Sequence, residues 1–152
     1  MELSTRRVHI AGITANPTDW FMGQATAGSL DFLQRARFVI HDRDSKFSLR
    51  FRIVLEDAGI EPVKTPYQAP NANAYAERRV RSIKEECLNR MILFGEGHLR
   101  RVVDEYIAHY HAERNHQGLG NRLIEQGDLA GDGEIFCRER LGGLLKFYSR
   151  AA

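Results

Sequence analysis

Two carboxylates stand in settings that suit divalent-metal chemistry. Asp42 ends the short apolar run 38–42, and Glu77 follows segment 70–74, which is expected to open a helix. Thirty-four residues separate the two acids. Two divalent ions about 3.5–4 Å apart can activate an attacking oxygen and stabilise the leaving oxygen of a phosphodiester. Because Mg²⁺ prefers oxygen ligands and keeps several waters, two or three carboxylates on rigid elements suffice to hold it.

Cationic and amide side chains share the expected helix surface with Glu77. Residues spaced by four, four and three positions lie along one side of a helix, and this ridge contains Asn73, Glu77, Arg81 and Lys84. A ridge that faces DNA has this composition, with one carboxylate for metal and its neighbours for phosphates. The alternative is an ordinary salt bridge between Glu77 and Arg81 on a solvated face, which contributes about 0.3–0.5 kcal/mol.

The elements that must position these residues alternate between strand and helix. Apolar periodicity, caps and glycines predict, in chain order, strand 6–13, helix 18–33, strand 37–42, helix 45–58, strand 60–65, helix 71–93 and helix 99–110. Ser45 is the expected cap of the second helix, and Gly59 is expected to end it. This order indicates an α/β fold. Ligands of open α/β sheets gather at the carboxyl ends of strands, where Asp42 is expected to lie.

Composition is compatible with one domain that binds nucleic acid. The chain has 152 residues, 43% of them hydrophobic, with a formal net charge of +2. Cys87 and Cys137 stand far apart without a CxxC pair, which favours reduced thiols over a zinc or redox site. We expect a soluble, cytoplasmic protein, because the N-terminus resembles no signal peptide and no apolar run approaches the ~20 residues that cross a bilayer.

Four segments, in order along the chain, resemble insertion-sequence transposases. HDRDSKF at 41–47 resembles their H-[SR]-D-R-[GD]-[SA]-[QK]-[FY] segment, and PNANAYAE at 70–77 resembles P-x-x-N-A-x-x-E. ERRVRSIKEE at 77–86 is similar to E-x-x-x-x-x-x-K-x-E, and HYHAERNHQGL at 109–119 is similar to H-Y-N-x-x-R-P-H-x-x-L. The chain therefore resembles a DDE-type integrase catalytic core, a family with a ribonuclease H-like mixed sheet flanked by helices.

The resemblance implies a role for each matching residue. Asp42 corresponds to the second acid of the family's triad and Glu77 to the third, and both hold Mg²⁺ or Mn²⁺, in a two-ion site, during DNA strand cleavage and transfer. The implied partner is DNA, both the element ends and the target, as in DNA integration and transposition. The implied DNA-binding residues are Asn73, Arg78, Arg81, Lys84 and Lys46.

The chain departs from the family pattern at its start. The family's first Asp lies on a strand upstream of the one expected near Arg6, and no Asp occurs in residues 1–5. We therefore expect an N-terminally truncated, catalytically impaired core over 1–118 that lacks the first strand. Its strand 6–13 would then form a bare sheet edge. Residues 119–152 are expected to form a C-terminal tail with a short apolar helix or strand.

Other interpretations remain open. The chain is alternatively a non-catalytic DNA-binding or oligomerising remnant, which forms homo-oligomers or associates with a full-length transposase. An unrelated ribonuclease H-like nuclease is the third possibility. Among other residues, Asp44 is favoured as part of the turn before a helix rather than as the triad acid. A structural role is favoured for His41, His109 and His111.

Overall fold

The computed structural model describes residues 1–67, 73–125 and 133–150. The chain divides into two compact units, one of residues 9–78 and the other of residues 1–8 together with 79–152. The architecture is mixed α/β, which confirms the expected class and is consistent with a ribonuclease H-like integrase core. No helix in the described ranges is long and apolar enough to cross a membrane.

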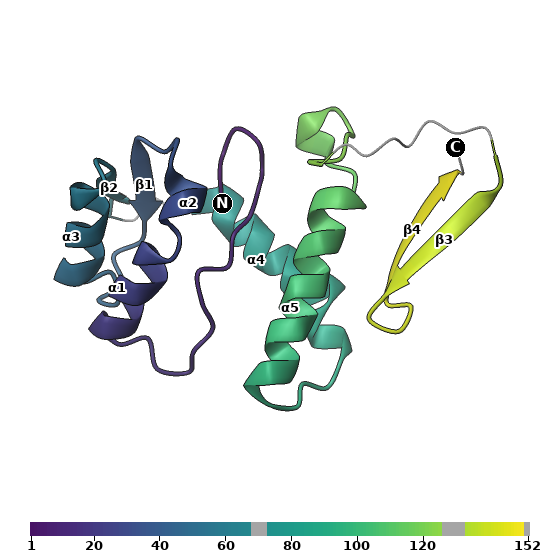
Figure 1. The fold of residues 1–152 in the computed structure, drawn as a ribbon, viewed down its shortest axis with the longest axis horizontal. Coiled ribbons are helices and arrows are strands. Elements are labelled where there is room, and N and C mark those ends of the chain that lie inside the picture. Colours follow the sequence, from purple (N-terminus) through teal and green to yellow (C-terminus); the bar gives the residue numbers. More distant parts are fainter. Residues whose placement is uncertain (68–72, 126–132, 151–152) are drawn as a thin grey trace. The chain divides into compact units, whose positions relative to one another are not determined.

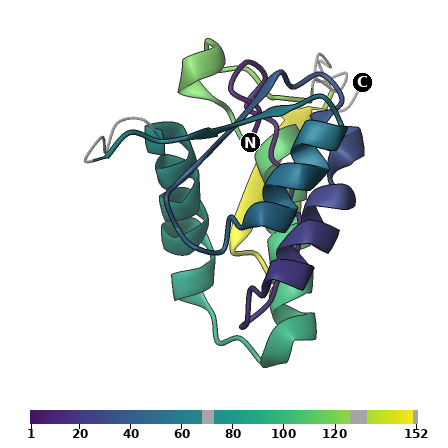
Figure 2. The same cartoon turned by 90° about the vertical axis from the view of Figure 1, so that its left-hand side faces the viewer.

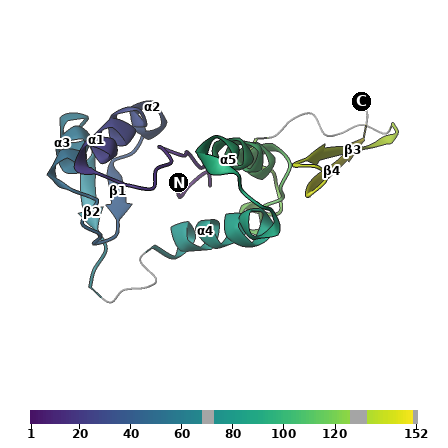
Figure 3. The same ribbon diagram turned by 90° about the horizontal axis from the view of Figure 1, so that it is seen from below.

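The unit of residues 9–78 pairs two strands through a helical crossover. Its elements are α1 Asp19–Ala27, α2 Leu30–Leu33, β1 Phe38–His41, α3 Leu49–Asp57, β2 Glu61–Lys64 and the first turn of α4 Ala74–Glu86 (Figure 1). β1 and β2 are parallel, with Phe38 opposite Glu61 and His41 opposite Lys64, and the two arrows point the same way in Figure 3. A parallel pair needs a crossover between its strands, and α3 supplies it.

The hydrophobic core of this unit is formed by the buried face of α3 and the residues that pack against it. Phe51, Leu55 and Ile60 are its buried apolar residues, and α1 packs beside α3 (Figure 2). Thr18 caps α1, because its hydroxyl accepts the Phe21 N–H at 3.2 Å. Gly59 has a φ of 75° just after α3, which confirms the predicted end of that helix.

The predicted strand 6–13 is wrong. Residues 6–13 form no strand, and Arg6 has a φ of 65°, which is incompatible with extended backbone. The Val8 N–H donates to His111 Nε2 at 3.0 Å instead of to a neighbouring strand. Glu2 and Arg7 close a local turn through their backbones. The alternation of apolar residues therefore did not produce a strand, and the bare edge that was expected along it is not present.

Helix α3 begins three residues later than predicted. Its N-cap is Ser48 rather than Ser45. Asp42 and Asp44 each accept a backbone N–H two residues further on, from Asp44 and Lys46 respectively. Such Asx turns offer the backbone an alternative to helix and delay the helix start.

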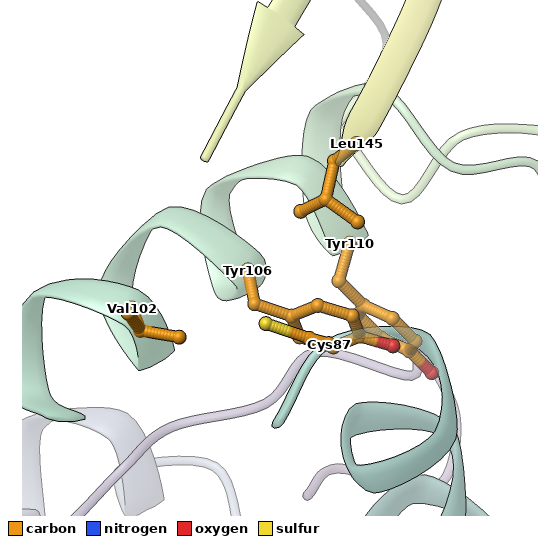
Figure 4. Close-up of a cluster of buried hydrophobic side chains, with 5 residues drawn as sticks. All are labelled: Cys87, Val102, Tyr106, Tyr110 and Leu145. Atoms are coloured by element: carbon orange, nitrogen blue, oxygen red, sulfur yellow. The ribbon is translucent and has the colours of Figure 1, made fainter. Parts of the chain in front are cut away.

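The second unit is built around the long helix α5. Besides the remainder of α4, its elements are the 3-10 turn η2 Leu88–Arg90, α5 Gly95–Ala112, the 3-10 turn η3 Gln117–Leu119, and the antiparallel strands β3 Ile135–Arg140 and β4 Leu145–Arg150. Its core contains Cys87, Val102, Tyr106, Tyr110 and Leu145 (Figure 4). Val102, Tyr106 and Tyr110 are buried on α5, where they recur at helical spacing along one face.

Helix α4 ends earlier than predicted and buries a different residue. It stops at Glu86 rather than near Leu93. At this end of the helix, Arg90 Nε donates to the Glu85 carbonyl at 2.9 Å. Apolar residues of the predicted helix 71–93 recur at helical spacing and put Val80 on the inward face, yet Val80 is half exposed, whereas Arg79 is only 7% exposed. Apolar spacing alone did not identify Arg79 as the buried position, because a cation was expected on the surface.

Contacts with two tyrosine rings of α5 offset part of the cost of removing the Arg79 charge from water. Its guanidinium carbon lies 3.9 Å from the Tyr110 ring centroid and 4.6 Å from that of Tyr106. Nε and Nη1 are buried without hydrogen-bond partners in the described residues. Burial lowers the pKa of Arg79, because charge is costly away from water. Arg79 is thus part of the packing between α4 and α5 rather than an exposed cation.

The β3–β4 hairpin is tied to α5 by a buried carboxylate. The side chain of Glu113 is 1% exposed and accepts hydrogen bonds from Arg140 Nε at 2.9 Å and Nη2 at 2.8 Å. His109 Nδ1 lies 3.0 Å from the same carboxylate. Burial alone raises the pKa of Glu113, but the hydrogen bonds from Arg140 and His109 outweigh it and lower the pKa to about 2.

The Glu113 cluster predicts a pH-dependent stability. Because the pKa of Glu113 falls from 4.5 to about 2 on folding, its contribution is complete above pH 4.5 and is lost as the pH falls towards 2. Glu113→Gln should lower the free energy of unfolding at pH 7 by about 3 kcal/mol and weaken this acid dependence. Urea unfolding across this pH range measures both effects.

Glu139→Gln, at an exposed ion pair with Lys146, is the control and should change stability by less than about 1 kcal/mol. Equal effects of the two variants would contradict the assignment.

Arg79 is buried and has no acidic partner among the described residues, which predicts that an apolar substitute is tolerated. Arg79→Met keeps most of the volume and removes the desolvated charge, so the variant should be at least as stable as the wild type. Arg79→Ala should be less stable than Arg79→Met by about 2–3 kcal/mol, because it leaves a cavity. Thermal and urea unfolding measure both, with the exposed Arg78→Met as control. A strongly destabilised Arg79→Met would show that the charge itself is required.

Candidate active site

Asp42 lies where the sequence placed it, directly after β1. The residue is exposed, and its Oδ1 accepts the Asp44 N–H at 3.1 Å. Its Oδ2 has no hydrogen-bond partner among the described residues. One carboxylate oxygen thus fixes the local turn while the other stays available to a ligand. Hard oxygen donors of this kind suit Mg²⁺ or Mn²⁺.

The loop that carries Asp42 is braced by its own side chains. Asp44 accepts the Lys46 N–H at 2.9 Å and pairs with the Lys46 ammonium at 2.9 Å. Hydrogen bonds to the Lys46 backbone and side chain lower the pKa of Asp44. Arg43 Nε donates to the Thr65 carbonyl at 3.0 Å and so joins the loop after β1 to the end of β2. Sequence reasoning missed the role of Arg43, because its distant partner carries no sequence signal.

Lys46, a predicted DNA-binding residue, is already engaged within this loop. Its ammonium pairs with Asp44 and lies 5.1 Å from the Phe47 ring centroid. The hydrogen bond that the Lys46 ammonium donates to the Asp44 carboxylate raises the pKa of Lys46 and keeps it charged. Part of its charge is offset locally, so its contact with DNA stays a prediction.

Glu77 is exposed in the first turn of α4. A carboxylate there is favoured by the partial positive charge of the helix N-terminus. Asn73 directly precedes the helix and is half buried. The described helix begins at Ala74, and the predicted start at Asn71 lies outside the described ranges together with residues 70–72 of the motif. The predicted ridge therefore begins in the turn before α4.

The three predicted cations of α4 are exposed. Arg81 and Lys84 lie four and seven residues after Glu77 and share its side of the helix, and Arg78 is adjacent to Arg81 at i,i+3. None of the three forms an ion pair with another residue in the part of the chain that the structure describes. Their ammonium and guanidinium groups are free to meet an anionic polymer such as a nucleic-acid backbone.

The structure does not assemble a complete metal site. Asp42 and Glu77 belong to the same compact unit, but no hydrogen bond or ion pair joins them, and residues 68–72 between them are not described. Within the described ranges, no group of three or more His, Cys, Asp or Glu side chains could hold a metal ion. The pairing of the two acids therefore stays a prediction.

Comparison with known proteins supports the same family as the motifs. Residues 58–123 match the Integrase core domain family, a stretch that contains Glu77 and the cations of α4 but not Asp42. Neither the curated proteins nor the solved structures gave a match. Domains of this family bind DNA and generally depend on divalent metal ions. Residues 58–123 are thus similar to the integrase core domain family, and this similarity suggests an integrase-type function on DNA.

Proposed function

We propose that this chain binds DNA through α4 and that Asp42 and Glu77 hold divalent metal for phosphodiester cleavage and strand transfer. The observation that carries the proposal is the position of Glu77 within the matched stretch 58–123, in the first turn of a helix whose next turns expose Arg81 and Lys84. The exposed carboxylate of Asp42 at the end of β1 supplies the second acid. Ends of strands and first turns of helices are rigid supports for such ligands.

The donor set fits Mg²⁺ or Mn²⁺. Mg²⁺ is commonly held by one or two carboxylates together with waters and substrate phosphate oxygens, so Asp42 and Glu77 match its needs in kind. When bound, the metal activates the attacking oxygen and stabilises the leaving one. The residues of this chain hold the ions and orient the DNA. Because the proposed site has two acids, where the resembled family uses three, we propose slow strand transfer.

DNA recognition in this proposal is dominated by phosphate contacts. Arg78, Arg81 and Lys84 would neutralise phosphates along one strand, with Asn73 just before the same helix, and Lys46 is proposed to add a further phosphate contact. Such contacts position DNA without reading its sequence. Transposition joins several DNA ends, so we also propose that the chain acts with a second copy or with a full-length transposase.

The phosphate contacts predict a salt-dependent affinity. Each Lys or Arg that contacts a phosphate adds about one unit to the slope of log K against log salt concentration. The double variant Arg81→Gln/Lys84→Gln should therefore bind duplex DNA more weakly and with a slope reduced by about two. Fluorescence anisotropy between 50 and ~200 mM salt measures this.

The matched control for DNA binding is a charge removed elsewhere. Arg101→Gln on α5 removes an exposed cation outside the proposed surface and should leave the slope unchanged. A double variant on α4 that keeps the wild-type affinity and slope would remove α4 from the proposed DNA surface.

The metal site predicts nicking of DNA that depends on Glu77. With Mg²⁺ or Mn²⁺ present, the chain should nick an end-labelled duplex slowly, and Glu77→Gln should reduce the rate by at least about 100-fold, because a metal ligand is lost. Glu85→Gln, an exposed acid on the same helix, should stay close to the wild-type rate. Equal rates for the wild type and Glu77→Gln would refute the site. DNA binding without nicking by the wild type would favour the non-catalytic remnant.

A further inference from the structure

His41 is a buried polar residue at the point where β1 meets the proposed site. It is the last residue of β1 and is 3% exposed. Its ring packs against Phe47 and Phe51, with centroid separations of 4.9 and 5.2 Å. Rings packed in this way leave the imidazole little rotational freedom, so its nitrogen atoms have fixed directions.

The hydrogen bond of His41 assigns its tautomer. Nδ1 lies 2.7 Å from the carbonyl oxygen of Asp42. Because a carbonyl oxygen only accepts, Nδ1 carries the hydrogen and donates it. Nε2 is buried and has no hydrogen-bond partner in the described residues. An apolar side chain would fill the same space without leaving a polar atom unsatisfied, so packing alone does not account for a histidine here.

The backbone on either side of Asp42 is held from two directions. The His41 carbonyl accepts the Thr65 N–H at 2.9 Å, which continues the pairing of β1 with β2. The Asp42 carbonyl is held by the His41 ring at the next peptide. The main chain is thus fixed at the residue whose carboxylate is exposed, while the carboxylate itself stays accessible.

We propose that His41 is a positioning residue that holds the main chain of Asp42 so that its carboxylate is presented to the metal ion. The inference rests on the proposed function of Asp42 as a metal ligand. A ligand fixed before binding loses less conformational freedom when the ion arrives, and groups that orient metal ligands typically change metal affinity by 10–100-fold when they are removed. The donor that does this is the Nδ1–H, and the Phe47 and Phe51 rings keep it aimed at the Asp42 carbonyl.

The test compares variants that keep or lose the Nδ1 donor. Asn places an amide N–H near the position of Nδ1, whereas Leu and Phe fill space without donating. Mn²⁺ binding to the full chain, followed by the electron paramagnetic resonance signal of free Mn²⁺, is expected to weaken about 10-fold in His41→Leu and His41→Phe. His41→Asn should stay within about threefold of the wild type. Thermal unfolding checks that the variants fold. If His41→Leu does not fold, His41→Phe replaces it in the comparison.

Each outcome decides one claim. Asp42→Asn should abolish the Mn²⁺ binding. If it does, but His41→Leu or His41→Phe binds Mn²⁺ as the wild type does, His41 does not position the ligand. If His41→Asn is as weak as the apolar variants, the donor is not what matters, and the inference is also overturned. If Asp42→Asn binds as the wild type does, Asp42 is not a ligand, and the proposed function fails together with the inference that rests on it.

Discussion

The parallel pairing of β1 with β2 is the constraint on which the proposed site depends. It sets His41 opposite Lys64 and so brings the ends of both strands to one edge of the sheet. The loop that carries Asp42 can then be braced across that edge, as the bond from Arg43 to the Thr65 carbonyl shows. The crossover helix α3 covers the pair and buries the strand-end His41 against Phe51. An exposed acid thus gains a rigid support from a small core.

In the helix that carries Glu77, one buried cation determines which of its neighbours are exposed. Its predicted cations project outward, while Arg79 turns inward onto Tyr106 and Tyr110. Burying one arginine of a basic run fixes the rotation of α4 against α5, because its planar group must lie over the rings. The neighbouring basic side chains of Arg78, Arg81 and Lys84 are thereby left on the exposed surface.

Sequence reasoning was most successful where a pattern is local. The apolar run that ends at Asp42, the stop at Gly59 and the buried face of α5 follow from spacing and single-residue conformations. It failed at 6–13, where a φ of 65° at Arg6 and a bond from Val8 to a distant histidine replace strand pairing. The Asx turns at Asp42 and Asp44 delayed α3, and an aromatic pair on another helix buried Arg79. The histidine and the tyrosines lie far away in the chain, and the Asx turns compete locally with the helix. The periodicity of apolar residues therefore revealed none of these contacts.

Asp42 and Glu77 are proposed to hold the same metal-ion site. A crystal structure of the chain with Mn²⁺ and a short DNA duplex decides this, because Mn²⁺ is located by its anomalous scattering. We expect Mn²⁺ bound to carboxylate oxygens of both Asp42 and Glu77, with a DNA phosphate beside it. Mn²⁺ bound elsewhere, or by only one of the two acids, would show that the two acids do not share a site.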